Sequence, residues 1–346
     1  MRAVRPAAVA AVTASVLLAA CSSSASSSGG GGSSPLQKVV WAQPGWNSLH
    51  IWGMVAVQQG FMQKNGVDLV VDDLQSPASG VPGLLSKSFD FVSESSEAAY
   101  EAQSMGANVK VVAIETDRSP FQLVVKPSVN STSELGAINF AVNAPGNSLD
   151  WVAARVVMHK LGYSPSQYSF VTSGPPATQE AALATGIVGA SMNFPPGSTL
   201  AVQKGAHILL TVASESYGNA PRASAPIIAD PAWYDAHRTA AVDFFKGMIE
   251  AMNFVYQPKN KATVVADIAK AEGISTTLAT DTYNFFVTDI GAVSHDPAPT
   301  LEELENSLKD DQQAGLKGLP APTAKALSGG CDDSLANAAE KAMSGK

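Results

Sequence analysis

The sequence has little cysteine, and its basic residues form no cluster. Of 346 residues only Cys21 and Cys331 are cysteines, which excludes a disulfide scaffold and a cysteine-based metal site. Lys and Arg total 22 against 30 Asp and Glu, and no Lys/Arg-rich run occurs, so we expect no nucleic-acid partner. The spacings of a helical zinc site, a P-loop, a dinucleotide fingerprint and a G-x-S-x-G elbow are also missing. We therefore expect no metal, no cofactor and no enzyme activity, unless an active site is built from dispersed residues.

The chain contains enough hydrophobic residues to form a folded core. Hydrophobic residues make up 45% of it and charged residues only 15%. That composition is too apolar for a disordered chain, and the length corresponds to roughly two domains of about 150 residues each.

Residues 1–20 have the features of an export signal. Arg2 and Arg5 precede an apolar stretch from Ala7 to Ala20, which is shorter than the about 18–20 residues that a membrane-spanning helix needs. The stretch ends in Leu-Ala-Ala followed by Cys21, which resembles the lipobox of bacterial lipoproteins. That resemblance implies cleavage before Cys21 and diacylation of this cysteine. The alternative is an ordinary signal peptide with an incidental cysteine.

Residues 21–35 would then be the lipidated cysteine and a flexible tether. Ser22–Pro35 consists of Ser, Gly, Ala and one Pro, a composition typical of flexible linkers. Because two acyl chains suffice for stable anchoring, we expect an exported chain held at the outer face of the bacterial cytoplasmic membrane.

The sequence after the linker predicts an α/β fold. Short β-like runs alternate with helical segments, which predicts βαβ units and mostly parallel sheets. The expected strands are Lys38–Ala42, Asp68–Leu74, Phe89–Ser93, Lys110–Glu115, Phe121–Val125, Ile138–Val142, Tyr168–Val171, Ala190–Phe194 and His207–Ala213. The expected helices between them are Leu49–Lys64, Glu97–Ser104, Leu149–Lys160 and Ala177–Thr185. After about Ala236 only helices are expected, at Ala240–Tyr256, Ala262–Ala271, Thr276–Thr288 and Leu301–Gln313.

Polar loops follow four of the expected strands. In open α/β sheets, ligands bind outside the carboxyl ends of strands, where helix N-termini present free N–H groups. Turn formation and helix capping explain each loop taken singly. Four such loops together favour a shared pocket, whose candidate residues are Gln43, Trp46, Asn47, Ser93, Glu94, Ser95, Asn143, Gly146, Asn147, Ser148, Asn193 and Phe194.

The order of these segments resembles the periplasmic solute-binding proteins of ABC importers, in the branch of nitrate, sulfonate, taurine and thiamine-pyrimidine (NMT1/THI5-like) binders. The stretches that carry the resemblance are Val55–Val70, Leu84–Val92, Val109–Val112, Leu123–Leu135, Ile138–Ser148 and Gly174–Phe194. The resemblance implies a type II periplasmic-binding-protein fold, with two hinged α/β lobes and a C-terminal helical extension on lobe one. Lobe one would be 36–125 plus 214–346, and lobe two 126–213.

The resemblance also implies partners: a small-molecule ligand in the cleft and the permease subunits of an ABC importer, served by a monomer. Asp150 already places a negative charge in the first turn of a lobe-two helix, which disfavours a plain oxyanion there. Glu94 needs a cation or hydrogen-bond donors, and Trp46, Trp52 and Phe194 suit a flat ring or an ammonium.

We therefore expect a small polar organic solute as the ligand. A plain oxyanion or an alkanesulfonate such as nitrate or taurine is the alternative within the same fold. An extracytoplasmic enzyme with a dispersed active site, or a purely structural lipoprotein, is the alternative of another class.

Overall fold

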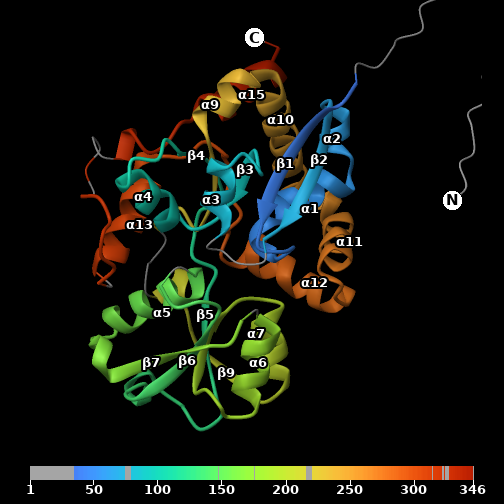
Figure 1. Cartoon of the computed structure of the whole chain (residues 1–346). Coiled ribbons are helices and arrows are strands. Elements are labelled where there is room, and N and C mark those ends of the chain that lie inside the picture. The colour runs from blue at the N-terminus through green and yellow to red at the C-terminus, as the bar shows by residue number, and fades with distance from the viewer. Residues whose placement is uncertain are drawn as a thin grey trace, which may run out of the picture. The chain divides into compact units, whose positions relative to one another are not determined.

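Two five-stranded sheets organise the part of the chain that the computed structural model describes, which is residues 35–74, 79–146, 148–174, 176–215, 220–313, 315–321, 323 and 327–345. The expected signal peptide, the lipidation site Cys21 and the linker up to residue 34 lie outside the described residues. Residues 35–346 form one unit (Figure 1). Within the described ranges, no helix combines the length and apolar character that crossing a bilayer requires.

The first sheet has the strand order β2-β1-β3-β10-β4. Its strands are β1 (Gln37–Gln43), β2 (Val67–Asp73), β3 (Phe91–Ser93), β4 (Lys110–Thr116) and β10 (Ala225–Ala229). We call this sheet with its helices lobe one. Its helices are α1 (Ile51–Gln58), α2 (Phe61–Lys64), α3 (Gly80–Leu85), α4 (Ser96–Ser104), α9 (Pro231–Ala236), α10 (Arg238–Val255), α11 (Lys261–Glu272), α12 (Thr276–Tyr283), α13 (Leu301–Gln313) and α15 (Ser334–Met343).

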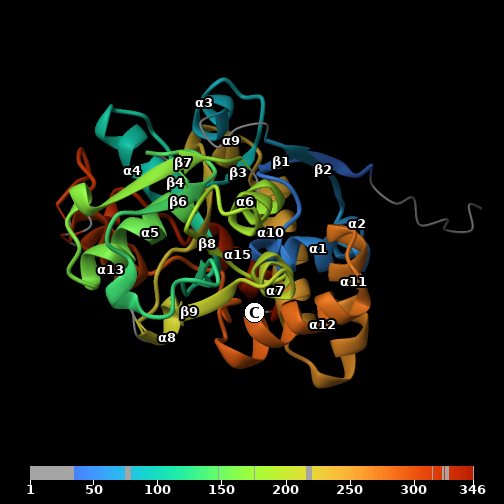
Figure 2. The ribbon, with the colours of Figure 1, turned by 90° about the horizontal axis from the view of Figure 1, so that it is seen from below.

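The second sheet repeats this pattern with the order β7-β6-β8-β5-β9. Its strands are β5 (Gln122–Val125), β6 (Ile138–Val142), β7 (Tyr168–Thr172), β8 (Ala190–Asn193) and β9 (His207–Thr211). We call this sheet lobe two, with helices α5 (Leu149–Lys160), α6 (Pro176–Ala184), α7 (Gly197–Gln203) and α8 (Val212–Glu215). Figures 1 and 2 show α5 on one side of the sheet and α6 with α7 on the other.

Both sheets are mixed rather than mostly parallel, which corrects the expectation from the sequence. In each, two strand pairs are parallel and two are antiparallel. The antiparallel pairs all involve β10 or β5, the strands that enter a sheet directly after the chain crosses from the other lobe. Such a strand is not the product of a βαβ crossover, so the handedness rule for parallel strands does not apply to it.

The crossing also moves one expected boundary. The sequence predicts Phe121–Val125 as the end of lobe one, but β5 pairs with β8 and β9 of the second sheet, so lobe two begins a strand earlier. The two crossing segments are hydrogen-bonded to each other: the Val212 amide donates to the Phe121 carbonyl, and the Arg222 amide to the Asp117 carbonyl. The two lobes are thus joined by adjacent, mutually bonded connections.

The carboxyl-terminal halves of β1 and β3 in lobe one are apolar on both faces because helices cover both. Trp41 and Phe91 point to the face that α1 and α10 cover, where Phe91 stacks on Phe244 with ring centroids 4.5 Å apart. Their neighbours Ala42 and Val92 belong to a second cluster under α3, α4 and α13. This alternation, with both sets buried, places the carboxyl ends of β1 and β3 at a fixed edge.

Candidate functional site

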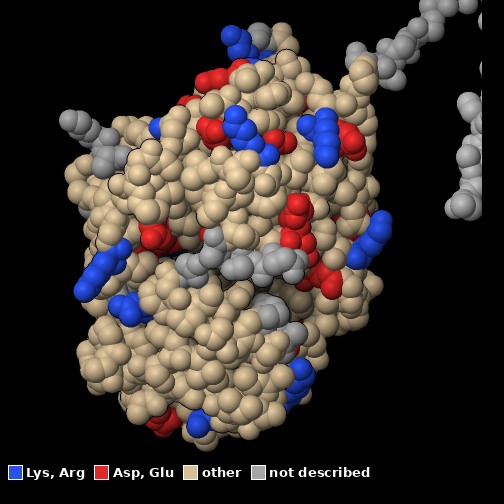
Figure 3. Space-filling view, viewed as in Figure 1, with Lys and Arg blue, Asp and Glu red and all other residues tan. Residues whose placement is uncertain are grey.

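A cavity of about 460 Å³ opens where the strand ends of the two lobes face each other. Trp46, Asn47, Ser93, Glu94 and Ser95 line it from lobe one, and Asn143, Ser148, Asn193 and Phe194 from lobe two. Nine of the expected site residues are therefore brought together. Figure 3 shows a hollow between the upper and lower parts of the molecule, with acidic side chains beside it.

Two expected residues lie elsewhere, and one lies outside the described residues. Gln43 is buried at the end of β1 but does not line the cavity, because its side chain is directed into the protein interior. Gly146 lies in an exposed turn with a φ of +101° and does not line the cavity either. Asn147 is outside the described ranges.

Several of the loop side chains serve the backbone, as the capping interpretation allowed. Asn47 accepts a hydrogen bond from the Leu49 amide at 3.1 Å and donates to the Gly45 carbonyl. Ser95 caps α4 by accepting from the Ala98 amide at 3.2 Å. Ser148 does not cap α5 with its side chain: its hydroxyl donates to the Ala144 carbonyl at 2.7 Å instead. These three residues shape the loops and line the cavity at the same time.

Ser93 belongs to a buried hydrogen-bond chain beneath the cavity. Its hydroxyl accepts from the Trp41 indole at 2.9 Å and donates to Glu115 at 3.3 Å. The same Glu115 oxygen lies 2.9 Å from Nδ1 of His50. The chain ties β1, β3 and β4 together just below the strand ends.

Asp150 fills the N-terminal end of α5. Its carboxylate accepts from the Asn143 amide and the Gln179 side chain, each at 2.7 Å, and from the Trp151 amide at 2.9 Å. Burial raises the pKa of Asp150, although these donors oppose the rise. Asp150 therefore occupies one N-terminal amide of α5, that of Trp151, together with two donors outside the helix.

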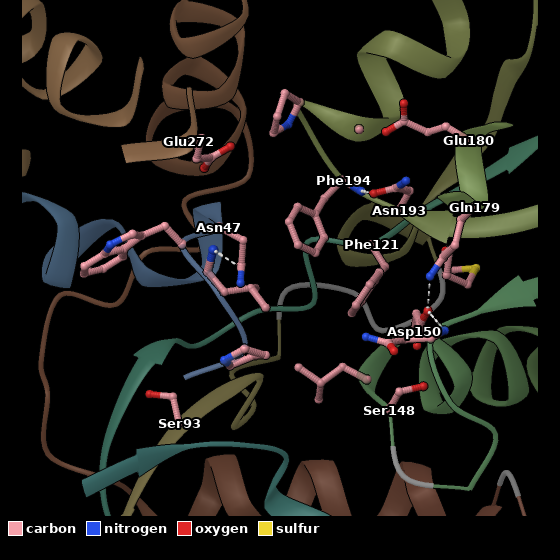
Figure 4. A pocket seen from close by; sticks show the side chains of 18 of the residues that line it. Asn47, Ser93, Phe121, Ser148, Asp150, Gln179, Glu180, Asn193, Phe194 and Glu272 are labelled. Atoms are coloured by element: carbon pink, nitrogen blue, oxygen red, sulfur yellow. Dashed lines mark hydrogen bonds between the residues drawn. The ribbon is translucent and has the colours of Figure 1, made fainter. Parts of the chain in front are cut away.

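Sequence reasoning missed much of the lining. Leu49, Leu74, Phe121, Gln179, Glu180, Met192, Gly197, Leu200, Glu272 and Ile274 also surround the cavity. Figure 4 shows Glu272 and Asn47 on one side, Gln179, Glu180 and Asn193 on the other, and Phe121 and Phe194 between them. Phe194 meets Phe121 edge-to-face at 5.4 Å and Phe286 of lobe one at 5.6 Å.

Three carboxylates of the cavity are held in different ways. Glu94 accepts from the Val81 amide at 3.1 Å, and Glu272 accepts from the Ser48 hydroxyl at 2.5 Å. Burial raises the pKa of each to about 7. Burial also raises the pKa of Glu180, which has Lys204 at 3.7 Å.

Solved structures of several proteins share this fold. They include a protein of Bordetella bronchiseptica RB50 (TM-score 0.73, 19% identity, 89% of this chain and 98% of that one). The periplasmic nitrate-binding protein NrtA from Synechocystis PCC 6803 matches with a TM-score of 0.70 and 15% identity, over 89% of both chains. The zinc-bound ligand-binding component of an ABC-type import system from Staphylococcus aureus matches with 0.67 and 14%, over 88% of this chain and 98% of that one.

These likenesses establish the fold as that of type II periplasmic binding proteins, with two mixed α/β sheets. No curated protein matches the chain in sequence. The family model described as NMT1/THI5 like matches residues 47–262, which is most of lobe one's N-terminal part, all of lobe two and the start of the C-terminal helices. The chain therefore belongs to the NMT1/THI5-like family.

Proposed function

We propose that the protein is the solute-binding component of an ABC importer and captures a small polar organic solute between its lobes. The observation that carries the proposal is the cavity lined by strand-end residues of both sheets. Because the lining comes from both lobes, a solute there gains its full set of contacts only when the lobes are closed on it.

The rest of the proposal concerns location and partners. The signal at residues 1–20 and Cys21 would place the protein outside the cell on a lipid anchor, with residues 22–35 as its tether. There it would act as a monomer and deliver the solute to the permease subunits. The similarity in fold to the ligand-binding component of an ABC-type import system supports this role.

We further propose binding without chemical conversion. The Ser93 hydroxyl donates to the Glu115 carboxylate, and His50 bonds to that same carboxylate. Among the described contacts no hydrogen bond joins His50 to Ser93, so the imidazole does not act as a base toward the hydroxyl. A nucleophile paired with a base is therefore not formed by these residues.

A plain oxyanion or an alkanesulfonate is the second candidate for the ligand. The likeness in fold to a nitrate-binding protein favours it. The position of Asp150 opposes it, since this carboxyl group lies in the first turn of α5 and accepts from the Trp151 amide there.

A thermal-shift screen of the full chain tests the function. Nitrate, sulfonates, pyrimidines, aromatic acids and amines are added one at a time, and each mixture is assayed for product. We expect at least one solute to raise Tm in a saturable way, without being consumed. Consumption of a solute would indicate an enzyme. No saturable shift with any solute would contradict the proposal.

A further inference from the structure

The cavity wall carries acidic side chains and no basic ones. Glu94 and Glu272 line it from lobe one, and Asp150 and Glu180 from lobe two, while the described lining contains no Lys, Arg or His. The described part of the wall therefore offers no charge partner to an anion.

The two carboxylates of lobe one are the ones that lack a cation. Asp150 is satisfied by three donors, and Glu180 has Lys204 nearby. Glu94 and Glu272 each accept one neutral hydrogen bond, and no ion pair of either one is found in the described part of the chain. Removing such a carboxylate from water without a cation is costly, which is why burial raises the pKa of both groups.

Glu94 can hold its position only because Gly80, which it contacts, has no side chain. A Cβ built on Gly80 would lie 2.2 Å from the Glu94 oxygen that accepts from the Val81 amide. Only glycine leaves room for the carboxylate against the start of α3. The carboxylate is thus held at the cavity by both a hydrogen bond and the local backbone.

The wall of lobe two has polar atoms that lack partners. Asn193 and Gln179 are each 2% exposed and line the cavity. The Nδ2 of Asn193 and the Oε1 of Gln179 have no hydrogen-bond partner. Buried amide atoms are normally paired, so these two leave hydrogen-bonding capacity at the cavity wall opposite the carboxylates.

From this arrangement we propose that the solute is an organic cation. Its protonated amine lies toward the wall of lobe one, which Glu94 and Glu272 make acidic, and its polar far end lies toward Asn193 and Gln179 of lobe two. Its apolar body lies against Phe121 and Phe194, whose rings stand between the two walls (Figure 4). This inference rests on the function proposed above and narrows its ligand class.

Titration calorimetry of the full chain with three probes of similar shape tests whether the cavity prefers a cationic solute. At pH 8 and constant ionic strength, we expect benzylamine to bind about tenfold or more tightly than benzyl alcohol, because a charged hydrogen bond adds to the contacts of the ring. Benzenesulfonate is expected not to bind. Tighter binding of benzenesulfonate, or no binding of benzylamine, would overturn the inference.

Variants of the two carboxylates test the site. Glu94→Gln and Glu272→Gln are each expected to weaken benzylamine about tenfold and to leave benzyl alcohol within about twofold. Gly80→Ala, which displaces Glu94 without removing it, should give the same selective loss. Glu101→Gln, on the exposed side of α4, is the matched control and should change neither probe. Equal losses for both probes in the Gln variants would refute the assignment of the amine to these residues.

Failure of this inference differs from failure of the proposed function. If anions or neutral solutes raise Tm in a saturable way and amines do not, the cleft binds a solute but not a cation. If no solute of any class binds, both proposals fail together.

Discussion

Trp46 and Asn143 illustrate how single side chains face the cavity from opposite lobes. Trp46 follows β1 and meets Trp41 edge-to-face at 5.9 Å, and Asn143 follows β6. Both are half-buried, and both line the cavity. Neither is part of the closed cores beneath the strand ends, whereas Trp52, only 1% exposed, is a core residue.

We expect Trp46→Ala and Asn143→Ala each to weaken solute binding about tenfold while the protein stays folded. The reason is that each loses contacts to the solute, whereas the fully buried core residues stay in place, although Trp46 also gives up its packing on Trp41. Affinity is measured by titration with the solute that the screen identifies, and folding by circular dichroism. Trp233→Ala is the control, because Trp233 stacks on His237 outside the cavity. Unchanged affinity in both cavity variants would contradict the proposed cleft.

The buried carboxyl groups give stability a defined dependence on pH. Glu94 has a pKa of about 7 in the folded protein against an ordinary value of 4.5. Between these values the unfolded chain releases the proton while the folded chain keeps it, so stability falls as the pH rises from about 4.5 to about 7 and then levels off. The contribution of Glu94 is about 2–3 kcal/mol, and Glu272 acts in the same direction.

Urea unfolding at pH 5 and pH 8 checks this dependence. The wild-type protein should lose more stability between the two values than Glu94→Gln does, because Gln cannot ionise. Glu101→Gln should behave as the wild type does. An identical pH dependence in Glu94→Gln and the wild type would show that Glu94 does not titrate in this window.

The segment after β1 forms two helices, where the sequence predicts one. The sequence predicts a continuous helix over Leu49–Lys64, and the structure ends α1 at Gln58 and starts α2 at Phe61. Between them Gly60 adopts a φ of +73°, in the left-handed region that other residues enter only at a cost. This break turns the chain so that α2 packs under β2 and α10.

Gly60→Ala is therefore expected to destabilise the protein by about 1–2 kcal/mol, through the backbone alone. The site itself has room for a Cβ, which would lie 4.0 Å from the Gln63 side-chain oxygen. The measurement is the free energy of unfolding in urea. Gly136→Ala is the control: its φ lies outside the left-handed region and its Cβ would make an ordinary 3.8 Å contact with Tyr163. Equal effects of the two substitutions would rule out backbone strain at Gly60.

The strand β10 was not expected from the sequence, although it lies inside the first sheet, between β3 and β4. Its run Ala225–Ala229 contains Pro226, and a proline within a short apolar run argues against a central strand. The structure accommodates Pro226 at an irregularity in the pairing with β4, where the register shifts between Ala225 and Pro226. Whether a ladder tolerates a proline depends on the partner strand, which local sequence does not reveal.

An ion-pair network on α13 connects the lobes at a distance from the cavity. Asp310 lies 2.9 Å from Lys160 at the end of α5 in lobe two and 2.6 Å from Arg222 on a crossing segment. The helix itself packs against both α4 and α5. The C-terminal part of the chain is therefore in contact with both lobes, although its helices belong mainly to lobe one.

We expect Asp310→Asn to lower the free energy of unfolding by about 1–3 kcal/mol, because it weakens charged hydrogen bonds to two groups at once. Lys160→Met should cost less than about 1 kcal/mol, since the Lys160 side chain is partly exposed to water. Urea unfolding of both variants measures which of them loses more free energy of unfolding. A larger loss in Lys160→Met than in Asp310→Asn would show that the contact with α5, rather than Arg222, carries the stability.

The local sequence by itself determines whether most segments form a helix or a strand. The expected bounds of α5 and α13 coincide with the observed Leu149–Lys160 and Leu301–Gln313, because apolar periodicity and terminal residues act within a few residues of sequence. The polar loops after β1, β3, β6 and β8 were recognisable for the same reason. Their assembly around a ligand remains a prediction for the experiments above.

Only the tertiary fold decides which distant residues join those loops. Glu272 ends α11 and Gln179 lies within α6, and neither follows a strand, so no local signal marks them as cavity residues. The fold brings them to the cavity because α11 packs beside α1, and α6 packs against β6 and β8. Burial and the distance to a charge partner are properties of that packing, and they determine which carboxylates at the cavity remain without a cation.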